Sequence, residues 1–172
     1  MAFGKVDTRK WVVGAVLYLH VPGKTSRNRT SMSPSITTRE FVIDDYDEAV
    51  ALWSVVEGVE VAEGDSKEEI RAYFLRNPSL SRVAEKDGTI VGAVLCGHDG
   101  RRGLIYHLAV MPAHHGQGIG RRLVQECVTR LREAGLTRAL IFVAQDNASG
   151  HSFWLRNGWE DVAGAILMGI DL

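Results

Sequence analysis

Three glycines at alternate positions make AHHGQGIGRRL, residues 113–123, the strongest candidate for chemistry in the chain. The apolar run LIYHLAVMP precedes this stretch, and VQECVTRLREAG, which has helical periodicity, follows it. A strand, a glycine-rich turn and a helix start together form an anion site, because free backbone N–H groups and the positive end of the helix dipole point at the ligand. The spacing therefore predicts a phosphate cradle.

Several glycine-rich sites bind phosphate, and the spacing separates them. A P-loop requires GxxxxGK[ST], whereas Gly118 is followed by Ile119, Gly120 and two arginines, so that interpretation fails. A dinucleotide fold requires GxGxxG early in a βαβ unit, but this chain has GxGxG after a hairpin and ends the next strand in VAQDN, which disfavours it. A glycine-rich connection that binds nothing is the remaining alternative.

Two segments resemble motifs of the GCN5-related N-acetyltransferase (GNAT) superfamily. LAVMPAHHGQGIGRRLV is similar to its apolar strand, V-x-P and [RQ]-x-x-G-x-[GA], and DNASGHSFWLRNGWE to its N-x-x-A-x-x-x-Y-x-x-x-G-F segment. The resemblance runs from about residue 36 to 172 and identifies a small, single-domain, bacterial-type member. It implies that acetyl-CoA is the co-substrate and that an acetyl group is transferred to an amine, by direct attack in a ternary complex.

The resemblance also implies a coenzyme A site. Its pyrophosphate would lie on backbone N–H groups of the glycine loop, and its pantetheine arm would pair with residues 108–110 as an added strand. The N–H of Ala109 or Val110 would polarise the thioester carbonyl, and Asn147 would contact pantetheine or cap the next helix. The implied cofactor-binding residues are Leu108, Ala109, Val110, His115, Gly116, Gln117, Gly118, Ile119, Gly120, Arg121, Asn147 and Trp154.

Two residues depart from the family pattern. His115 stands where the loop usually has Arg or Gln, so a permanent charge is lost and affinity becomes more sensitive to pH. Trp154 stands where the family often has a tyrosine that protonates the departing thiolate. Its indole is no usable acid, and core packing is an alternative role. These departures keep a second function open, an acetyl-CoA-binding sensor or interaction module. A domain that binds no coenzyme A ranks last.

The general base has several candidates. Some relatives carry a glutamate on the strand that matches LIFVA, but Phe142 or an apolar neighbour occupies that place. Tyr106 and His107 lie on the central strand, where we expect them to alternate faces, so that one of them points into a given cleft. Tyr106 is the preferred catalytic candidate, and His107 as a buried structural histidine is the alternative. Four acids between the first two helices predict a cationic acceptor pocket or a solvated surface: Glu57, Glu60, Glu63 and Asp65.

Other polar groups carry weaker signals. His98, His114 and His151 share no spacing typical of a metal site, and we expect no metal. Asp99, Arg101 and Arg102 either grip an acceptor or are exposed charges of a hairpin turn. The acceptor is either a small amine or a protein amino group, and an exposed strand edge near the C-terminus permits a homodimer.

Composition limits the remaining functions. The formal net charge of −1 gives no support to nucleic-acid binding. Two cysteines without metal spacing suit small buried thiols in a reducing cytoplasm. The apolar run 11–21 is too short to span a membrane. Residues 1–33 are interpreted as an N-terminal extension, with an added strand or a targeting signal as alternatives, and Met32 as an alternative start.

The elements that must position these residues follow from periodicity. A strand at 35–43 precedes helices at 44–59 and 66–77, the second with a Ser66–Glu69 capping box. A hairpin at 81–97 turns at Asp87-Gly88, and a strand at 104–110 completes a meander. Next we expect a helix from 119 to about 135 and a strand at 138–144 that is apolar on both faces. A helix at 146–158 and one or two strands within 159–172 complete the chain. We expect an α/β domain at 34–172 with a mixed, mostly antiparallel sheet flanked by helices on both faces.

Overall fold

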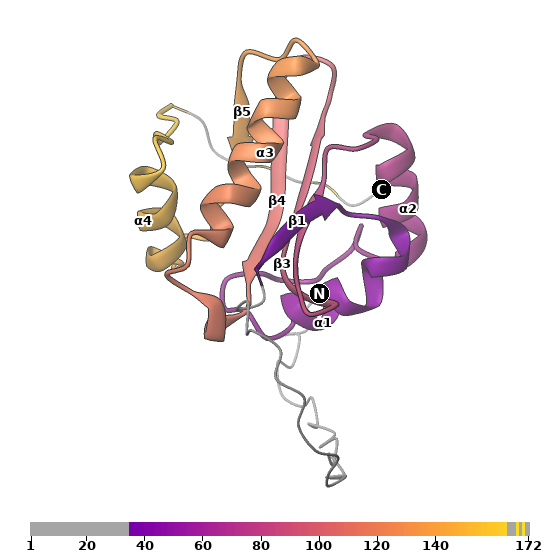
Figure 1. Ribbon diagram of the computed structural model, residues 1–172. Helices are drawn as coiled ribbons and strands as arrows, with labels where there is room; N and C mark the ends of the chain where they lie inside the picture. The colour runs from indigo at the N-terminus through magenta and orange to yellow at the C-terminus, as the bar shows by residue number, and fades with distance from the viewer. Residues whose placement is uncertain (1–34, 165–167, 169, 171–172) are drawn as a thin grey trace, which may run out of the picture. The chain divides into compact units, whose positions relative to one another are not determined.

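The computed structural model describes residues 35–164, Met168 and Ile170, and the predicted N-terminal extension lies outside them. One sheet has the order β1-β2-β3-β4-β5, and its pairs are antiparallel except for the parallel pair β4–β5 (Figure 1). The mixed, mostly antiparallel sheet is therefore confirmed. The elements are β1 (Thr37–Glu40), α1 (Tyr46–Trp53), α2 (Lys67–Arg76), β2 (Arg82–Lys86), β3 (Thr89–His98), β4 (Gly103–Val110), α3 (Ile119–Glu133), β5 (Ala139–Ile141) and α4 (Ala148–Arg156), with 3₁₀ turns at Ile43–Asp45 and Pro112–His114.

Short sequence signals set several element boundaries. Asp87 and Gly88 both have positive φ angles, 53° and 78°, as the predicted type I′ turn between β2 and β3 requires. At the start of α2, the Ser66 side chain accepts a hydrogen bond from the backbone N–H of Glu69, and the Glu69 carboxylate accepts one from the backbone N–H of Ser66. This capping box satisfies two N–H groups that the helix itself leaves free.

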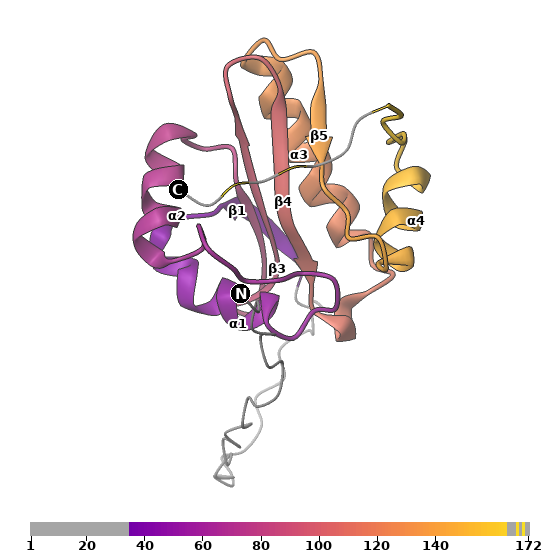
Figure 2. The same cartoon turned by 180° about the vertical axis from the view of Figure 1, so that it is seen from behind.

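Helices cover both faces of the sheet, as expected. On one face α3 packs against β2, β3 and β4 and buries its apolar stripe there, and Trp154 of α4 belongs to the same apolar cluster. On the other face lie α1 and α2 (Figure 2). They enclose a second apolar cluster, which includes the fully buried Trp53. No helix among residues 35–164 is long and apolar enough to cross a bilayer.

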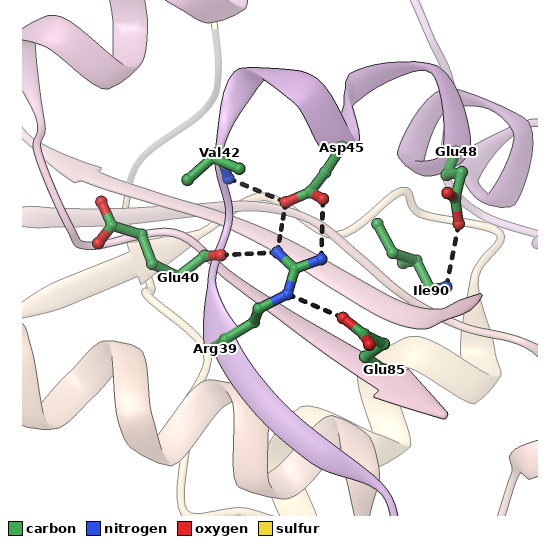
Figure 3. A network of polar contacts seen from close by, with 7 residues as sticks. All are labelled: Arg39, Glu40, Val42, Asp45, Glu48, Glu85 and Ile90. Atoms are coloured by element: carbon green, nitrogen blue, oxygen red, sulfur yellow. Dashed lines mark hydrogen bonds and ion pairs between the residues drawn. The ribbon is translucent and has the colours of Figure 1, made fainter. Parts of the chain in front are cut away.

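A polar network fastens β1 to its neighbours (Figure 3). The guanidinium of Arg39 donates to both oxygens of Asp45, over 2.6 and 2.9 Å, and to Glu85 on β2 over 2.9 Å. The Asp45 carboxylate also accepts from the backbone N–H of Val42. Nearby, the Glu48 carboxylate of α1 accepts from the N–H of Ile90 on β3 over 3.1 Å. These bonds fix α1 against the edge and centre of the sheet.

Two expectations about element lengths are wrong. The helix at 44–59 is shorter, because α1 ends at Trp53. The strand at 138–144 is reduced to β5, its three residues are only half-buried, and Phe142 beyond it is 52% exposed. An unbroken apolar run predicted two covered faces, but β5 lies at a sheet edge within the described part of the chain. The one or two strands predicted within 159–172 stay a prediction, because residues 159–164 form no strand and most of the remaining residues lie outside the described part of the chain.

Candidate active site

The centre of the site is a β-bulge in β4. Leu95 of β3 lies opposite Tyr106, whereas Ala93 lies opposite Ala109, so β4 contains one extra residue between these pairs. At this point His107 has φ 50°, a left-handed conformation that is uncommon for a residue with a side chain. Bulges re-aim side chains and often lie next to functional sites. The bulge is therefore a place where the strand departs from the regular alternation.

The predicted alternation of Tyr106 and His107 is wrong for that reason. Tyr106 packs against the cluster enclosed by α1 and α2. The His107 ring meets Trp53 of the same cluster edge-to-face, with ring centroids 4.8 Å apart. Leu108 then packs on the opposite face, against the cluster under α3. The extra residue thus turns two consecutive polar side chains toward one face.

On that face His107 meets a carboxylate from a distant part of the chain. Its Nε2 lies 2.8 Å from Oδ1 of Asp65, which belongs to the segment joining α1 to α2. The other oxygen of Asp65 accepts from the backbone N–H of Ala62, and the Tyr46 hydroxyl donates to the Asp65 carbonyl oxygen. The side chains of His107 and Asp65 are 18% and 11% exposed, so the pair is mostly shielded yet reachable.

The other acids of this segment differ from Asp65. Glu57, Glu60 and Glu63 are all exposed. Figure 2 shows the segment that joins α1 to α2 running across one face of the sheet. The sequence named Asp65 and His107 as separate candidates, but their contact spans 42 residues and no local signal predicts it.

Tyr106 lies beside the pair along β4. Its ring is 6.3 Å from the ring of Phe142, the residue that follows β5. Burial raises the pKa of the Tyr106 hydroxyl above its ordinary value. The phenol therefore stays protonated at neutral pH, which suits a hydrogen-bond or proton donor and does not suit a base.

The edge of β4 that faces β5 is open along this stretch. Within the described residues, β5 pairs with β4 only as far as Ile105. On the other edge, the N–H of Met111 donates to the carbonyl oxygen of Val91 on β3, over 2.8 Å. Because N–H directions alternate along a strand, the N–H of Val110 points to the open edge. The same alternation directs the N–H of Ala109 toward β3, so Val110 is the better placed of the two predicted oxyanion donors.

The predicted phosphate cradle lies between β4 and α3. Gly116 and Gly118 have φ angles of 75° and 77°, and a Cβ at either would meet no protein atom within 4 Å. In the described part of the chain the N–H groups of Gly116, Gln117 and Gly118 donate no hydrogen bond, and α3 starts at Ile119 with its own first N–H groups free. These groups and the open space beside them fit a bound phosphate.

The cradle is held close to the sheet. A Cβ on Gly92 of β3 would lie 3.1 Å from the Ile119 side chain, so the start of α3 packs directly on the strand. At the other end of the loop, Nε2 of His115 lies 2.7 Å from the Val110 carbonyl oxygen, which requires a proton on Nε2. His115 thus fastens the loop to β4.

Residues of α4 flank the open edge. The Asn147 side chain accepts from the N–H of Gly150 over 2.8 Å, so the predicted capping role is confirmed. A Cβ on Gly58 would collide with the Asn147 amide, which brings the segment between α1 and α2 against the start of α4. Trp154 is 7% exposed and packs edge-to-face on Phe153 and Trp159, the alternative that the sequence left open.

Two of the remaining polar candidates, Asp99 and His151, have structural partners. One oxygen of Asp99 accepts from the backbone N–H groups of Arg101 and Arg102, both over 2.7 Å, and these bonds lower the pKa of the Asp99 carboxyl. This arrangement is that of a hairpin turn with exposed charges. His151 pairs with Asp161. Over the described residues, no group of three or more His, Cys, Asp or Glu side chains is arranged to hold a metal ion.

Comparisons with known proteins agree with this geometry. Residues 43–159 match the acetyltransferase (GNAT) family. An acetyltransferase of Yersinia pestis (strain Pestoides F) is 35% identical over 109 residues, which cover 63% of this chain and 77% of the relative. An acetyltransferase of Sodalis glossinidius is 30% identical over 131 residues, 76% of this chain and 92% of the relative.

Solved structures support the fold. A PaiA N-acetyltransferase from Thermoplasma acidophilum, in complex with coenzyme A, superposes with a TM-score of 0.64 at 22% identity, over 73% of this chain and 90% of that one. An aminoglycoside 6′-N-acetyltransferase from Acinetobacter haemolyticus gives 0.65 at 14% identity, over 79% and 99%. The resemblance inferred from the two sequence motifs is confirmed.

Proposed function

Because the chain belongs to the acetyltransferase (GNAT) family, we propose that it transfers the acetyl group of acetyl-CoA to a primary amine by direct attack in a ternary complex. The observation that carries this proposal is the cradle at Gly116–Gly118, whose N–H groups are free and open to a ligand, next to the open edge of β4. The cradle would hold the pyrophosphate, and the strand edge would receive the pantetheine arm.

Val110 is proposed to take part in both the binding of acetyl-CoA and the transfer of its acetyl group. Its N–H, directed to the open edge, would polarise the thioester carbonyl, and charge developing on that oxygen makes the bond stronger in the transition state. Bound acetyl-CoA supplies an activated acyl group and a thiolate as leaving group. Tyr106, which stays protonated at neutral pH and lies beside Phe142 where β5 ends, is proposed to assist the departure of the thiolate.

The acceptor is proposed to be cationic. The segment between α1 and α2 presents Glu57, Glu60 and Glu63 to solvent beside the face that holds His107. Three exposed carboxylates attract a positively charged amine during encounter. A small amine and a protein amino group both carry the positive charge that these carboxylates would attract. The two buried free thiols, Cys96 and Cys127, agree with a cytoplasmic location.

An acetyl-CoA-binding sensor or interaction module with little turnover is the second candidate. Its support comes from the family resemblance: Trp154 stands where the family often has a catalytic tyrosine, and Phe142 or an apolar neighbour stands where some relatives carry a glutamate. Trp154 is packed in the core and offers no acid.

Binding and turnover separate these functions. Acetyl-CoA at 100 times its dissociation constant should stabilise the folded protein by about 2.7 kcal/mol, seen as a rise in Tm. Release of free thiol should then be followed across a panel of small polyamines, amino sugars and lysine peptides. A Tm rise without thiol release for any amine would support the sensor, and no Tm rise at millimolar acetyl-CoA would overturn both functions.

A further inference from the structure

We infer that His107 is the general base that takes the proton of the acceptor amine, and that Asp65 positions it. This inference rests on the proposed acetyl transfer. It starts from a contact between two residues that regular strand alternation would not bring together. The bulge in β4 turns His107 toward the face of α1 and α2, where Asp65 lies 2.8 Å from its Nε2.

The contact sets the tautomer of the imidazole. A carboxylate oxygen is only an acceptor, so the bond to Asp65 requires the proton on Nε2. The lone pair of a neutral imidazole then lies on Nδ1, which has no hydrogen-bond partner in the described part of the chain. A histidine whose one nitrogen donates to a carboxylate and whose other nitrogen is free has the arrangement of a general base.

Asp65 is itself held in place. Its Oδ2 accepts from the backbone N–H of Ala62, over 2.9 Å, and its carbonyl oxygen accepts from the Tyr46 hydroxyl, over 2.8 Å. The bond from Tyr46 therefore holds the backbone of Asp65, and the bond from Ala62 holds its carboxylate. The carboxylate can orient the ring and stabilise the imidazolium that forms when a proton is taken.

The backbone conformation of His107 is an independent reason to assign its side chain a chemical role. A left-handed conformation costs a residue with a side chain about 1–2 kcal/mol relative to the right-handed one. Glycine adopts this conformation without that cost, whereas the position with φ 50° carries a histidine, one of the few side-chain residues that adopt it more often than most. Strain held at a bulge beside an open strand edge indicates a site where the side chain has a chemical role.

The position of His107 suits the step. Residues 106–110 form the stretch of β4 whose edge is open to a pantetheine arm. The acceptor ammonium gives one proton to Nδ1 of His107, and the nitrogen lone pair forms a bond to the acyl carbon. The bond between that carbon and sulfur breaks, and its electrons leave on the thiolate. After the attack the nitrogen carries two protons, of which one passes to solvent and one stays on the amide product.

The charged and titratable groups around the pair come from four elements. Asp65 is the carboxylate in contact, and Tyr106 precedes His107 on β4. From α1, Trp53 packs on the ring and Tyr46 bonds to Asp65. Burial raises the pKa of both tyrosines. The further charges that act on Tyr46 are Asp47 from α1 and Lys67 and Glu68 from α2.

The first test is His107→Asn, because asparagine tolerates the left-handed backbone and cannot act as a base. We expect kcat/KM to fall by about 100-fold or more. The wild-type profile of kcat/KM against pH should have an ascending limb that the variant lacks, and a merely structural histidine would leave that limb in place. The dissociation constant for acetyl-CoA should change little, since the change lies outside the cradle.

The second test is Asp65→Asn. The new amide can still accept from Ala62, but its NH₂ group donates to Nε2 and moves the imidazole proton to Nδ1. We expect kcat/KM to fall at least about tenfold. The double variant should be no slower than His107→Asn alone, because both changes remove one function.

The control is a second pair of the same chemistry. His151 and Asp161 are also 2.8 Å apart but lie on α4 and after it, well exposed. His151→Asn and Asp161→Asn should retain the wild-type rate and pH profile. If the wild type releases thiol and His107→Asn keeps both rate and ascending limb, the inference is wrong and the acetyl transfer stands. If the wild type releases none with any amine, it is the proposed transfer that fails.

Discussion

Nε2 of His115 donates a hydrogen bond to the carbonyl oxygen of Val110, over 2.7 Å. The first residue of the glycine loop is thereby bonded to Val110 at the end of β4, and the N–H of Val110 faces the open strand edge. The sequence marks His115 as a departure from the family pattern, and its contact gives that departure a structural role. The loop and the strand edge, which are proposed to hold opposite ends of one ligand, share this bond.

His115→Ala should weaken acetyl-CoA binding, because the loop loses its tie to β4. A neutral hydrogen bond contributes about 1 kcal/mol, or about fivefold in the dissociation constant. His115→Gln is the matched variant, since its amide can still donate to Val110. Isothermal titration calorimetry would measure both. Equal affinities for the wild type and the alanine variant would contradict the role of the bond.

Gly118 and Gly120 should respond oppositely to alanine. Gly118 has φ 77°, so a Cβ is strained there and projects into the space beside the free N–H groups. A Cβ on Gly120 would lie 3.5 Å from the Phe153 ring, an ordinary contact inside a helix. We expect Gly118→Ala to abolish the Tm rise caused by acetyl-CoA, and Gly120→Ala to raise the stability of the free protein by up to about 1 kcal/mol. Retained ligand stabilisation in Gly118→Ala would contradict the cradle.

Local signals predict most of the fold. The Asp87-Gly88 turn and the Ser66 capping box each lie within a few residues, and the apolar stripe of α3 lies within one helix. The structure contains all three. The glycine loop is likewise readable, because strand, turn and helix start follow one another in sequence. These features depend on neighbouring residues alone, and a single sequence therefore suffices to predict them.

The centre of the site depends on a β-bulge and on a contact between distant residues, and sequence spacing predicts neither. Strand alternation assigns Tyr106 and His107 to opposite faces, but one extra residue opposite Val94 reverses this. A bulge of this kind leaves no glycine or proline to reveal it. The contact of His107 with Asp65 then requires the path of a long connecting segment. For another reason, the sequence did not predict that β5 is short: an apolar run looks similar in a central strand and in an edge strand.

Tyr106→Phe tests the hydroxyl beside this pair. Because burial raises the pKa of Tyr106, the phenol remains a donor across neutral pH. If it assists departure of the thiolate, we expect kcat to fall by about 10- to 100-fold at every pH from 6 to 9. The ascending limb that belongs to His107 should remain. Thiol release measured against pH distinguishes the two residues, and an unchanged kcat would remove Tyr106 from the catalytic group.

Asp45→Asn should destabilise the fold in a way that depends on pH. Burial alone would raise the pKa of the Asp45 carboxyl, but the bonds from Arg39 and from the Val42 N–H outweigh it and lower that pKa. A carboxyl with a lowered pKa in the folded state contributes stability above its unfolded value, about 3.9, and loses it as pH falls through the folded value. Since Arg39 is 41% exposed and solvent screens the pair, we expect a loss of about 1–2 kcal/mol at pH 7.

Urea unfolding of the wild type and the Asp45→Asn variant at several pH values would measure this difference. The gap in unfolding free energy should be constant from about pH 7 to pH 5 and should shrink below about pH 4, where the wild-type carboxyl loses its charge. Asp47→Asn is the matched control, because Asp47 pairs with Lys67 but is 78% exposed. Its cost should stay under about 0.5 kcal/mol. A gap for Asp45→Asn that persists unchanged at pH 3 would show that the amide loses packing or a hydrogen bond there, and that the charge of Asp45 contributes nothing.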